Sequence, residues 1–101
     1  MRVHSDPFFS LAVRRSDAGT IVSVAGELDV ATAPELEQAL AGAEGQVMID
    51  LSATTFADPA TLRVLLAARA RGVRVRVLPR RGAAVARLLA LTDTERLLRL
   101  A

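Results

Sequence analysis

The sequence predicts a small α/β domain whose helices pack on a single sheet. At 101 residues the chain is long enough for one hydrophobic core, and a hydrophobic content of 51% indicates a folded globule. Short strand-favouring runs alternate with helix-favouring segments, an order that crossover connections build into a sheet. We expect residues 1–101 to form one domain, with a flexible segment over residues 1–7.

Two strands and a helix are expected in the first part of the chain. Residues 9–14 and 20–25 favour strands, and the turn-like "SDAG" between them predicts an antiparallel pair. Thr32 and Glu35 are spaced as a capping box, and Pro34 falls in the first turn, where a missing N–H is tolerated. An amphipathic helix is therefore expected to begin at Thr32.

The middle of the chain holds a strand pattern followed by the helix with the clearest ends. Residues 46–51, "QVMIDL", form a continuous apolar run, typical of a strand that is covered on both faces and lies at the centre of a sheet. Asp58 is placed as an N-cap and Pro59 as the first helical residue, and Gly72 marks the end of the helix.

The last part of the chain continues the alternation. Residues 73–78, "VRVRVL", alternate strictly, so one face of this strand should be buried while its arginines lie toward solvent or near a sheet edge. Residues 82–91 are expected to form a third helix, and residues 97–100 a last short strand or a frayed end.

Charge is distributed unevenly along the chain. The net charge is only +2, but residues 1–58 carry three arginines and nine acidic residues, a net of −6, whereas residues 59–101 carry a net of +8. Such asymmetry can mark a nucleic-acid surface. Because Tyr and Trp are absent and all Phe residues lie upstream of the basic half, no stacking platform accompanies the arginines. We interpret them as solvated helix and strand faces and expect no nucleic-acid partner.

Few residues could support catalysis, metal binding or cofactor binding. The chain has no cysteine, and its one histidine, His4, lies in the segment expected to be flexible. No phosphate-cradling, dinucleotide or nucleophile-elbow motif occurs. The carboxylates of Asp29, Asp50 and Asp58 could converge at one sheet edge, but each has a simpler use as a cap or turn residue. We therefore expect no enzyme activity, no metal and no cofactor.

No apolar run approaches the length of a signal-peptide core or of a membrane span. Together with the absence of cysteine, this predicts a cytoplasmic protein that is not inserted in a membrane.

The strand and helix motifs resemble those of the STAS family, the sulfate transporter and anti-sigma factor antagonist domain. The resemblance runs from about residue 8 to residue 100, through "VSVAGELDVATAPELEQAL", "VMIDLSATTFADPATLRVLLAA", "VRVRVL" and "LLALTDTERLL". Its most specific parts are "GELD", "DLS" and the F-x-D-x-x-x-L pattern that opens the second helix. It implies a mixed sheet of four to five strands with helices mainly on one face.

In the anti-sigma factor antagonists of this family, the second helix opens with Asp-Ser-Ser-Gly or Asp-Ser-Ala-Gly. The hydroxyl after the Asp is phosphorylated by a partner that is both a kinase and an anti-sigma factor, and the phosphorylated antagonist dissociates from it. On this sequence the matching positions are Asp58, Pro59, Ala60 and Thr61, and "GELD" places Asp29 nearby. Pro59 has no hydroxyl, so the usual modification cannot occur there.

Proline also changes the physics of this helix start. A phosphate would be held by free N–H groups and by the positive end of the helix dipole, and proline removes one of those N–H groups. Asp58 already supplies a cap and a negative charge. The hydroxyls of Thr54, Thr55 and Thr61 are weaker alternative acceptors, because Thr side chains commonly bond locally.

The sequence therefore favours a non-enzymatic interaction domain that resembles an anti-sigma factor antagonist but lacks its phospho-switch. The resemblance implies a histidine-kinase-type ATPase as partner. A strip of small residues on the second helix, flanked by Arg63 and Arg71, could let a partner approach closely, or could simply be an outer face rich in alanine for helix propensity. The strip consists of Ala60, Val64, Ala67 and Ala68. The expected partner-binding residues are Asp29, Asp58, Pro59, Ala60, Thr61, Arg63, Val64 and Ala67.

Two other functions stay open. The domain could be a transport-associated STAS subunit of a lipid-importing ABC system, which would also act by binding. It could instead bind a small ligand or nucleotide, although no glycine loop that would cradle a phosphate is present.

Overall fold

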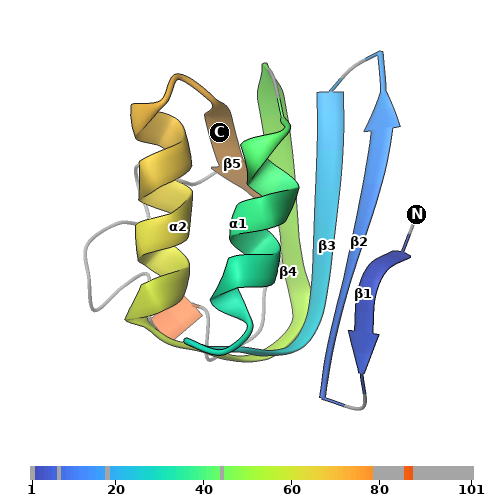
Figure 1. Ribbon diagram of the computed structural model, residues 1–101, viewed down its shortest axis with the longest axis vertical. Coiled ribbons are helices and arrows are strands. Elements are labelled where there is room, and N and C mark those ends of the chain that lie inside the picture. Colours follow the sequence, from blue (N-terminus) through green and yellow to red (C-terminus); the bar gives the residue numbers. More distant parts are fainter. Residues whose placement is uncertain (1, 7, 18, 44, 79–85, 88–101) are drawn as a thin grey trace.

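The computed structural model describes residues 2–6, 8–17, 19–43, 45–78 and 86–87. Its five strands and two helices follow the order β-β-β-α-β-α-β (Figure 1). The elements are β1 (Arg2–Asp6), β2 (Phe9–Ser16), β3 (Gly19–Leu28), α1 (Ala33–Ala41), β4 (Gln46–Ala57), α2 (Pro59–Ala70) and β5 (Arg74–Val77).

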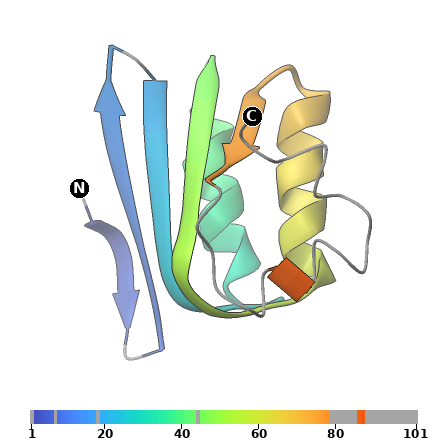
Figure 2. The same ribbon diagram turned by 180° about the vertical axis from the view of Figure 1, so that it is seen from behind.

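The five described strands form one mixed sheet in the order β1-β2-β3-β4-β5. β2 runs antiparallel to both β1 and β3, whereas β4 runs parallel to both β3 and β5. Both helices lie on the same face of this sheet, in front of it in Figure 1 and behind it in Figure 2. The predicted fold class, a mixed α/β sheet with helices on one face, is confirmed.

The hydrophobic core lies between this face and the two helices. Inward-facing residues alternate along the strands, and the helices add their own apolar faces, so each large side chain contributes about 1.5–3 kcal/mol by leaving water. The largest fully buried side chains are Leu11, Leu28, Leu36, Leu40, Ile49, Leu51, Leu65, Val22, Val24, Val47 and Val75.

The N-terminal residues differ from expectation. We expected residues 1–7 to be a flexible segment, but Arg2–Asp6 forms β1 and pairs with β2, with Asp6 opposite Phe9. The physical reason is that β2 has a free edge on which a preceding segment can complete backbone hydrogen bonds. Local sequence carries little sign of such pairing, because "RVHSD" shows no regular alternation.

The start of α1 also differs from the expected capping box. The Oγ1 of Thr32 makes no capping bond to the helix; it accepts from the Asp29 backbone N–H at 2.8 Å and donates to the Glu27 carbonyl at 2.9 Å. Asp29 closes the turn before the helix, because its Oδ1 accepts from the N–H groups of Ala31 at 2.9 Å and Thr32 at 3.1 Å, and its carbonyl accepts from the Ala33 N–H at 2.7 Å. The capping box was wrong because a residue before the helix competes for the same groups.

The predicted ends of α2 are confirmed. Pro59 is the first helical residue, and the helix is followed by Gly72 at φ +98°. The Gly72 N–H donates to the Arg69 carbonyl at 3.0 Å and the Val73 N–H to the Ala68 carbonyl at 3.2 Å, the two bonds of a Schellman motif.

The predicted strand over residues 46–51 lies inside the sheet but not at its middle. β4 is flanked by β3 and β5, so β3 is the central strand of the described sheet. Val47 and Ile49 are fully buried on the helix side, whereas Met48 and Asp50 are half-buried on the other face. The strand is therefore not equally covered on both faces.

The predicted strand over residues 73–78 is confirmed as β5. Val75 and Val77 are buried, whereas Arg74 is exposed and Arg76 half-buried. The helix expected over residues 82–91 falls in the described part only at residues 86 and 87, which are helical, and the last strand expected over residues 97–100 lies outside it.

Candidate functional site

Three chain junctions meet at one end of the sheet. The turn between β1 and β2, the junction of β3 with α1 and the junction of β4 with α2 all lie at the lower end in Figure 1. Parallel pairing of β3 with β4 brings Leu28 opposite Ala57, so the residues that start the two helices are neighbours. We refer to this part of the molecule as the helix-start end.

The last residue of β3 anchors the start of α2. The Leu28 carbonyl accepts hydrogen bonds from the Asp58 backbone N–H at 3.2 Å and from the Thr61 Oγ1 at 3.2 Å. The Asp58 Oδ1 caps the helix by accepting from the Ala60 N–H at 2.9 Å. The first turn of α2 is thus fixed both by its own cap and by the neighbouring strand.

Burial and hydrogen bonding decide which of the alternative phosphoacceptors, Thr54, Thr55 and Thr61, a kinase could reach. The Thr61 side chain is 2% exposed and its hydroxyl is engaged by Leu28. Thr54 is also 2% exposed, and its hydroxyl donates to the Val24 carbonyl at 3.0 Å. Both hydroxyls are inaccessible to a kinase in this conformation, whereas Thr55 is exposed.

The three candidate carboxylates do not form one cluster. Asp29 and Asp58 both lie at the helix-start end, where they accept bonds from the turn before α1 and from the first turn of α2, whereas Asp50 lies within β4 and its Oδ1 accepts from the Ser52 N–H at 3.0 Å. Within the described residues no group of three His, Cys, Asp or Glu side chains could hold a metal ion. Their arrangement is that of caps and local turns.

Three large apolar side chains are exposed in the chain junctions of the helix-start end, a feature that was not predicted. Phe8 is 71% exposed, Val30 72% and Phe56 48%. Phe56 is the cross-strand partner of Glu27, whose N–H donates to the Phe8 carbonyl at 2.9 Å, so both aromatic residues flank this part of β3. Only the F-x-D spacing of Phe56 and Asp58 could have drawn attention to one of them.

The predicted small-residue strip divides between core and surface. Ala68 is completely buried in the core, whereas Ala60, Val64 and Ala67 line a groove of about 440 Å³ between α1 and α2. Its α2 rim carries Arg63 and Arg71, as predicted. Its α1 wall is formed by Val30, Ala33, Pro34, Glu37 and Leu40. We call this feature the interhelix groove.

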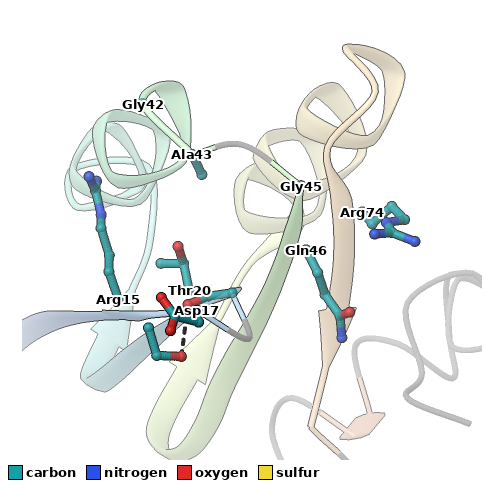
Figure 3. Close-up of a pocket in the computed structure, with 10 residues that line it drawn as sticks. Arg15, Asp17, Thr20, Gly42, Ala43, Gly45, Gln46 and Arg74 are labelled. Carbon is teal, nitrogen blue, oxygen red and sulfur yellow. Dashed lines mark hydrogen bonds between the residues drawn. The ribbon is translucent and has the colours of Figure 1, made fainter.

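A larger cleft of about 620 Å³ lies at the opposite end of the sheet (Figure 3). Arg15 reaches toward the end of α1 near Gly42, whereas Arg74 extends away from β5 on the other side of the cleft. Asp17 lies between them. The two cations do not converge, and this cleft shows no assembled site.

The arginines of α2 and β5 also make local contacts. Arg69 Nη1 and Arg76 Nη1 donate to the Val75 carbonyl at 3.5 and 3.3 Å, and Arg71 Nη2 donates to the Leu40 carbonyl at 3.4 Å. These bonds are long and therefore weak. Arg71 is exposed, whereas Arg69 and Arg76 are half-buried. Among the described helices, none has the length and hydropathy required to cross a membrane.

Comparison with known proteins agrees with this architecture. The family model described as "Mlab, STAS domain" matches residues 11–99. The crystal structure of an anti-sigma factor antagonist from Mycobacterium paratuberculosis is 33% identical, with a TM-score of 0.77, and the match covers 94% of this chain and 87% of that one.

A second structure, the STAS domain of an anti-sigma factor antagonist from Rhodobacter sphaeroides, is 27% identical over 72% of this chain and 88% of that chain, with a TM-score of 0.55. A structure from Thermotoga maritima, at 18% identity, shares the fold with a TM-score of 0.66 over 88% of this chain and 83% of that one. None of the curated protein sequences matches this chain. From the family match over most of its length, the chain belongs to the STAS domain family.

Proposed function

We propose that this domain works by binding a protein partner through its helix-start end, as an anti-sigma factor antagonist without a phospho-switch and without enzyme activity of its own. The observation that carries the proposal is the exposure of Phe8, Val30 and Phe56, which lie in the chain junctions of the helix-start end. Exposed apolar patches rimmed by polar groups are typical of protein interaction sites.

The acidic residues of the helix-start end suggest which charges the partner surface carries. Glu27, Asp29 and Asp58 belong to the same chain junctions as these apolar residues, and Pro59, which follows Asp58, is exposed. A partner with an apolar contact bordered by Arg or Lys would complement this surface.

The eight partner-binding residues expected from the sequence have different positions in the structure. Thr61 is buried and positions the start of α2, Asp58 caps α2, and Asp29 closes the turn before α1. Contact with the partner is therefore assigned mainly to the more accessible residues. These are Pro59, Arg63, Val64 and Ala67, with Ala60 at the groove floor.

The proposed partner is a cytoplasmic histidine-kinase-type ATPase that also serves as an anti-sigma factor. Since Pro59 offers no hydroxyl, ATP turnover by such a partner should leave the complex intact. The test is a binding assay between the full chain and candidate kinase-type anti-sigma factors, with and without ATP. Unchanged affinity supports the proposal, and loss of binding together with phosphate incorporation contradicts it.

A matched pair of variants locates the surface. Phe56→Ser removes an exposed aromatic side chain at the helix-start end and should weaken binding about tenfold or more, as expected for an interface anchor. Ala41→Ser changes an exposed residue at the far end of α1 and should leave affinity unchanged. Equal affinities of the two variants would place the partner elsewhere on the domain.

The transport-associated role remains the second candidate, because it also needs only a binding surface. Affinity capture from the source cells separates the two: a kinase-type ATPase in the eluate supports the first proposal, and a transporter ATPase with its permease supports the second. A thermal-shift screen with nucleotides and apolar ligands tests small-ligand binding, since a ligand that binds only the native state raises apparent stability.

A further inference from the structure

The interhelix groove has an apolar floor and opens along two helices that run in the same direction. Leu40 is 1% exposed, Ala33 5% and Ala60 8%, whereas Val64 is half-buried and Ala67 exposed. Both α1 and α2 begin at the helix-start end, so the groove extends from that end toward the C-termini of the helices (Figure 1). The groove is therefore continuous with the proposed binding surface at Val30 and Ala60.

The small side chains on α2 determine how closely a partner can approach. Ala60 and Ala67 lie two turns apart on the groove side of α2, with Val64 between them. Alanine at such positions lets another helix lie close to the backbone, in the way that ridges fit into grooves. An extended segment would leave its own backbone groups unpaired against these side chains, since the groove offers no strand edge.

The two rims of the groove differ in charge. Arg63 and Arg71 lie on the α2 rim about 12 Å apart along the helix axis at 1.5 Å per residue. Within the described part of the chain, the Arg63 guanidinium has no hydrogen bond, and the Arg71 guanidinium has one, the 3.4 Å bond to the Leu40 carbonyl. Glu37 is exposed on the α1 rim. A complementary ligand needs acidic groups on one flank and a basic group on the other.

We infer that the interhelix groove receives an amphipathic helix of the protein partner. This helix presents small or aliphatic residues to the floor at i, i+3 or i+4 and i+7 spacing, carboxylates toward Arg63 and Arg71, and a Lys or Arg toward Glu37. The inference rests on the proposed function, because it names the kind of segment with which the partner would extend its contact beyond the helix-start end.

A designed peptide tests whether the interhelix groove binds an amphipathic helix, and the test does not require the partner to be identified. The probe is a stapled amphipathic helix of about four turns, with leucine and alanine on one face, glutamates spaced to meet Arg63 and Arg71, and a lysine on the opposite flank. Its charge-reversed twin is the control. Binding to the full chain is measured by fluorescence anisotropy, and its location by shifts of backbone amide resonances.

The expected result is saturable binding with the largest shifts at Val64 and Ala67. The charge-reversed peptide should bind about fivefold or more weakly, and the double variant Arg63→Glu, Arg71→Glu should reverse this preference. Ala67→Gln should weaken the original peptide about tenfold by filling the groove, whereas Ala70→Gln, on the exposed side of the same helix, should not. No saturable binding, equal affinity for both peptides, or shifts confined to other surfaces overturns the inference.

The two proposals fail in different ways. If a kinase-type partner binds and Phe56→Ser weakens it but Ala67→Gln does not, the helix inference is wrong while the proposed function stands. If no protein partner binds at the helix-start end, the proposed function is wrong, whatever the peptide does.

Discussion

Alanine substitutions at Gly26 and Gly72 together measure how closely the β1–β2 turn packs against β3. Both have a positive φ, +95° at Gly26 and +98° at Gly72. A Cβ at Gly72 would meet no atom within 4 Å, whereas a Cβ at Gly26 would overlap the carbonyl oxygen of Phe8 and lie 2.8 Å from its carbonyl carbon. Both Gly→Ala variants therefore carry the strain of a positive φ, and only Gly26→Ala adds a clash.

The magnitudes follow from these two contributions. A non-glycine residue at positive φ costs about 1–2 kcal/mol, which is the full expected effect of Gly72→Ala. Gly26→Ala adds a backbone overlap that only a shift of the turn can relieve, worth about 1–3 kcal/mol by analogy with overpacked cores. Since 1 kcal/mol moves the melting temperature of a domain of this size by about 4–8 °C, Gly26→Ala should melt roughly 4–24 °C below Gly72→Ala.

Urea denaturation followed by circular dichroism measures the free energies of unfolding of both variants and of the parent chain, with the thermal midpoints as a second readout. Equal destabilisation of the two variants, or a smaller effect at Gly26, would falsify the close approach of Phe8 to β3. Because that approach also holds the exposed Phe8 in place, Gly26→Ala should weaken partner binding at temperatures where the variant is still folded.

Three further predictions concern the start of α2 and the strand before it. Pro59→Ser restores a hydroxyl at the family position and should incorporate label from a kinase-type partner and ATP, whereas Pro59→Ala should not. Asp58→Ala should lower the free energy of unfolding by about 1 kcal/mol through loss of the cap to the Ala60 N–H, and Asp58→Asn by much less. Thr54→Val should cost about 1–3 kcal/mol, because the Val24 carbonyl loses a buried donor, while Thr54→Ser keeps the hydroxyl.

Each of these predictions can fail clearly. A partner that binds Pro59→Ser but does not phosphorylate it shows that the complex lacks kinase geometry. Asp58→Ala with unchanged urea stability means that Pro59 and the bonds to the neighbouring strand are sufficient to start the helix. A neutral Thr54→Val shows that a water or a second donor satisfies the Val24 carbonyl.

Sequence reasoning succeeded where the signal is local. Asp58, Pro59 and Gly72 define the ends of α2 through their own backbone and cap chemistry, so their types and spacing are sufficient. The alternation in β5 similarly identifies which of its residues are buried. By contrast, the capping box at Thr32 failed because its hydroxyl is used by residues that precede the helix, a competition that spacing does not reveal.

The candidate site was only partly predictable, for a different reason. The rim arginines of the groove and its Ala60, Val64 and Ala67 wall follow from helical periodicity, but the opposite wall belongs to α1 and depends on how the helices pack. The grouping of Phe8 with Phe56 depends on pairing across three strands. Strand β1 was missed because edge pairing is a property of two segments together.

The double hydrogen bond to the Leu28 carbonyl has a consequence for association kinetics. The Leu28 carbonyl holds the start of α2, and the carbonyl of the next residue, Asp29, accepts from the Ala33 N–H at the start of α1. One stretch of backbone therefore fixes both helix starts at once. A surface tied down in this way is preorganised, and binding to it loses little conformational entropy in this domain. Differences in affinity among surface variants should then appear mainly as differences in dissociation rate, with association rates set by the charges around the patch.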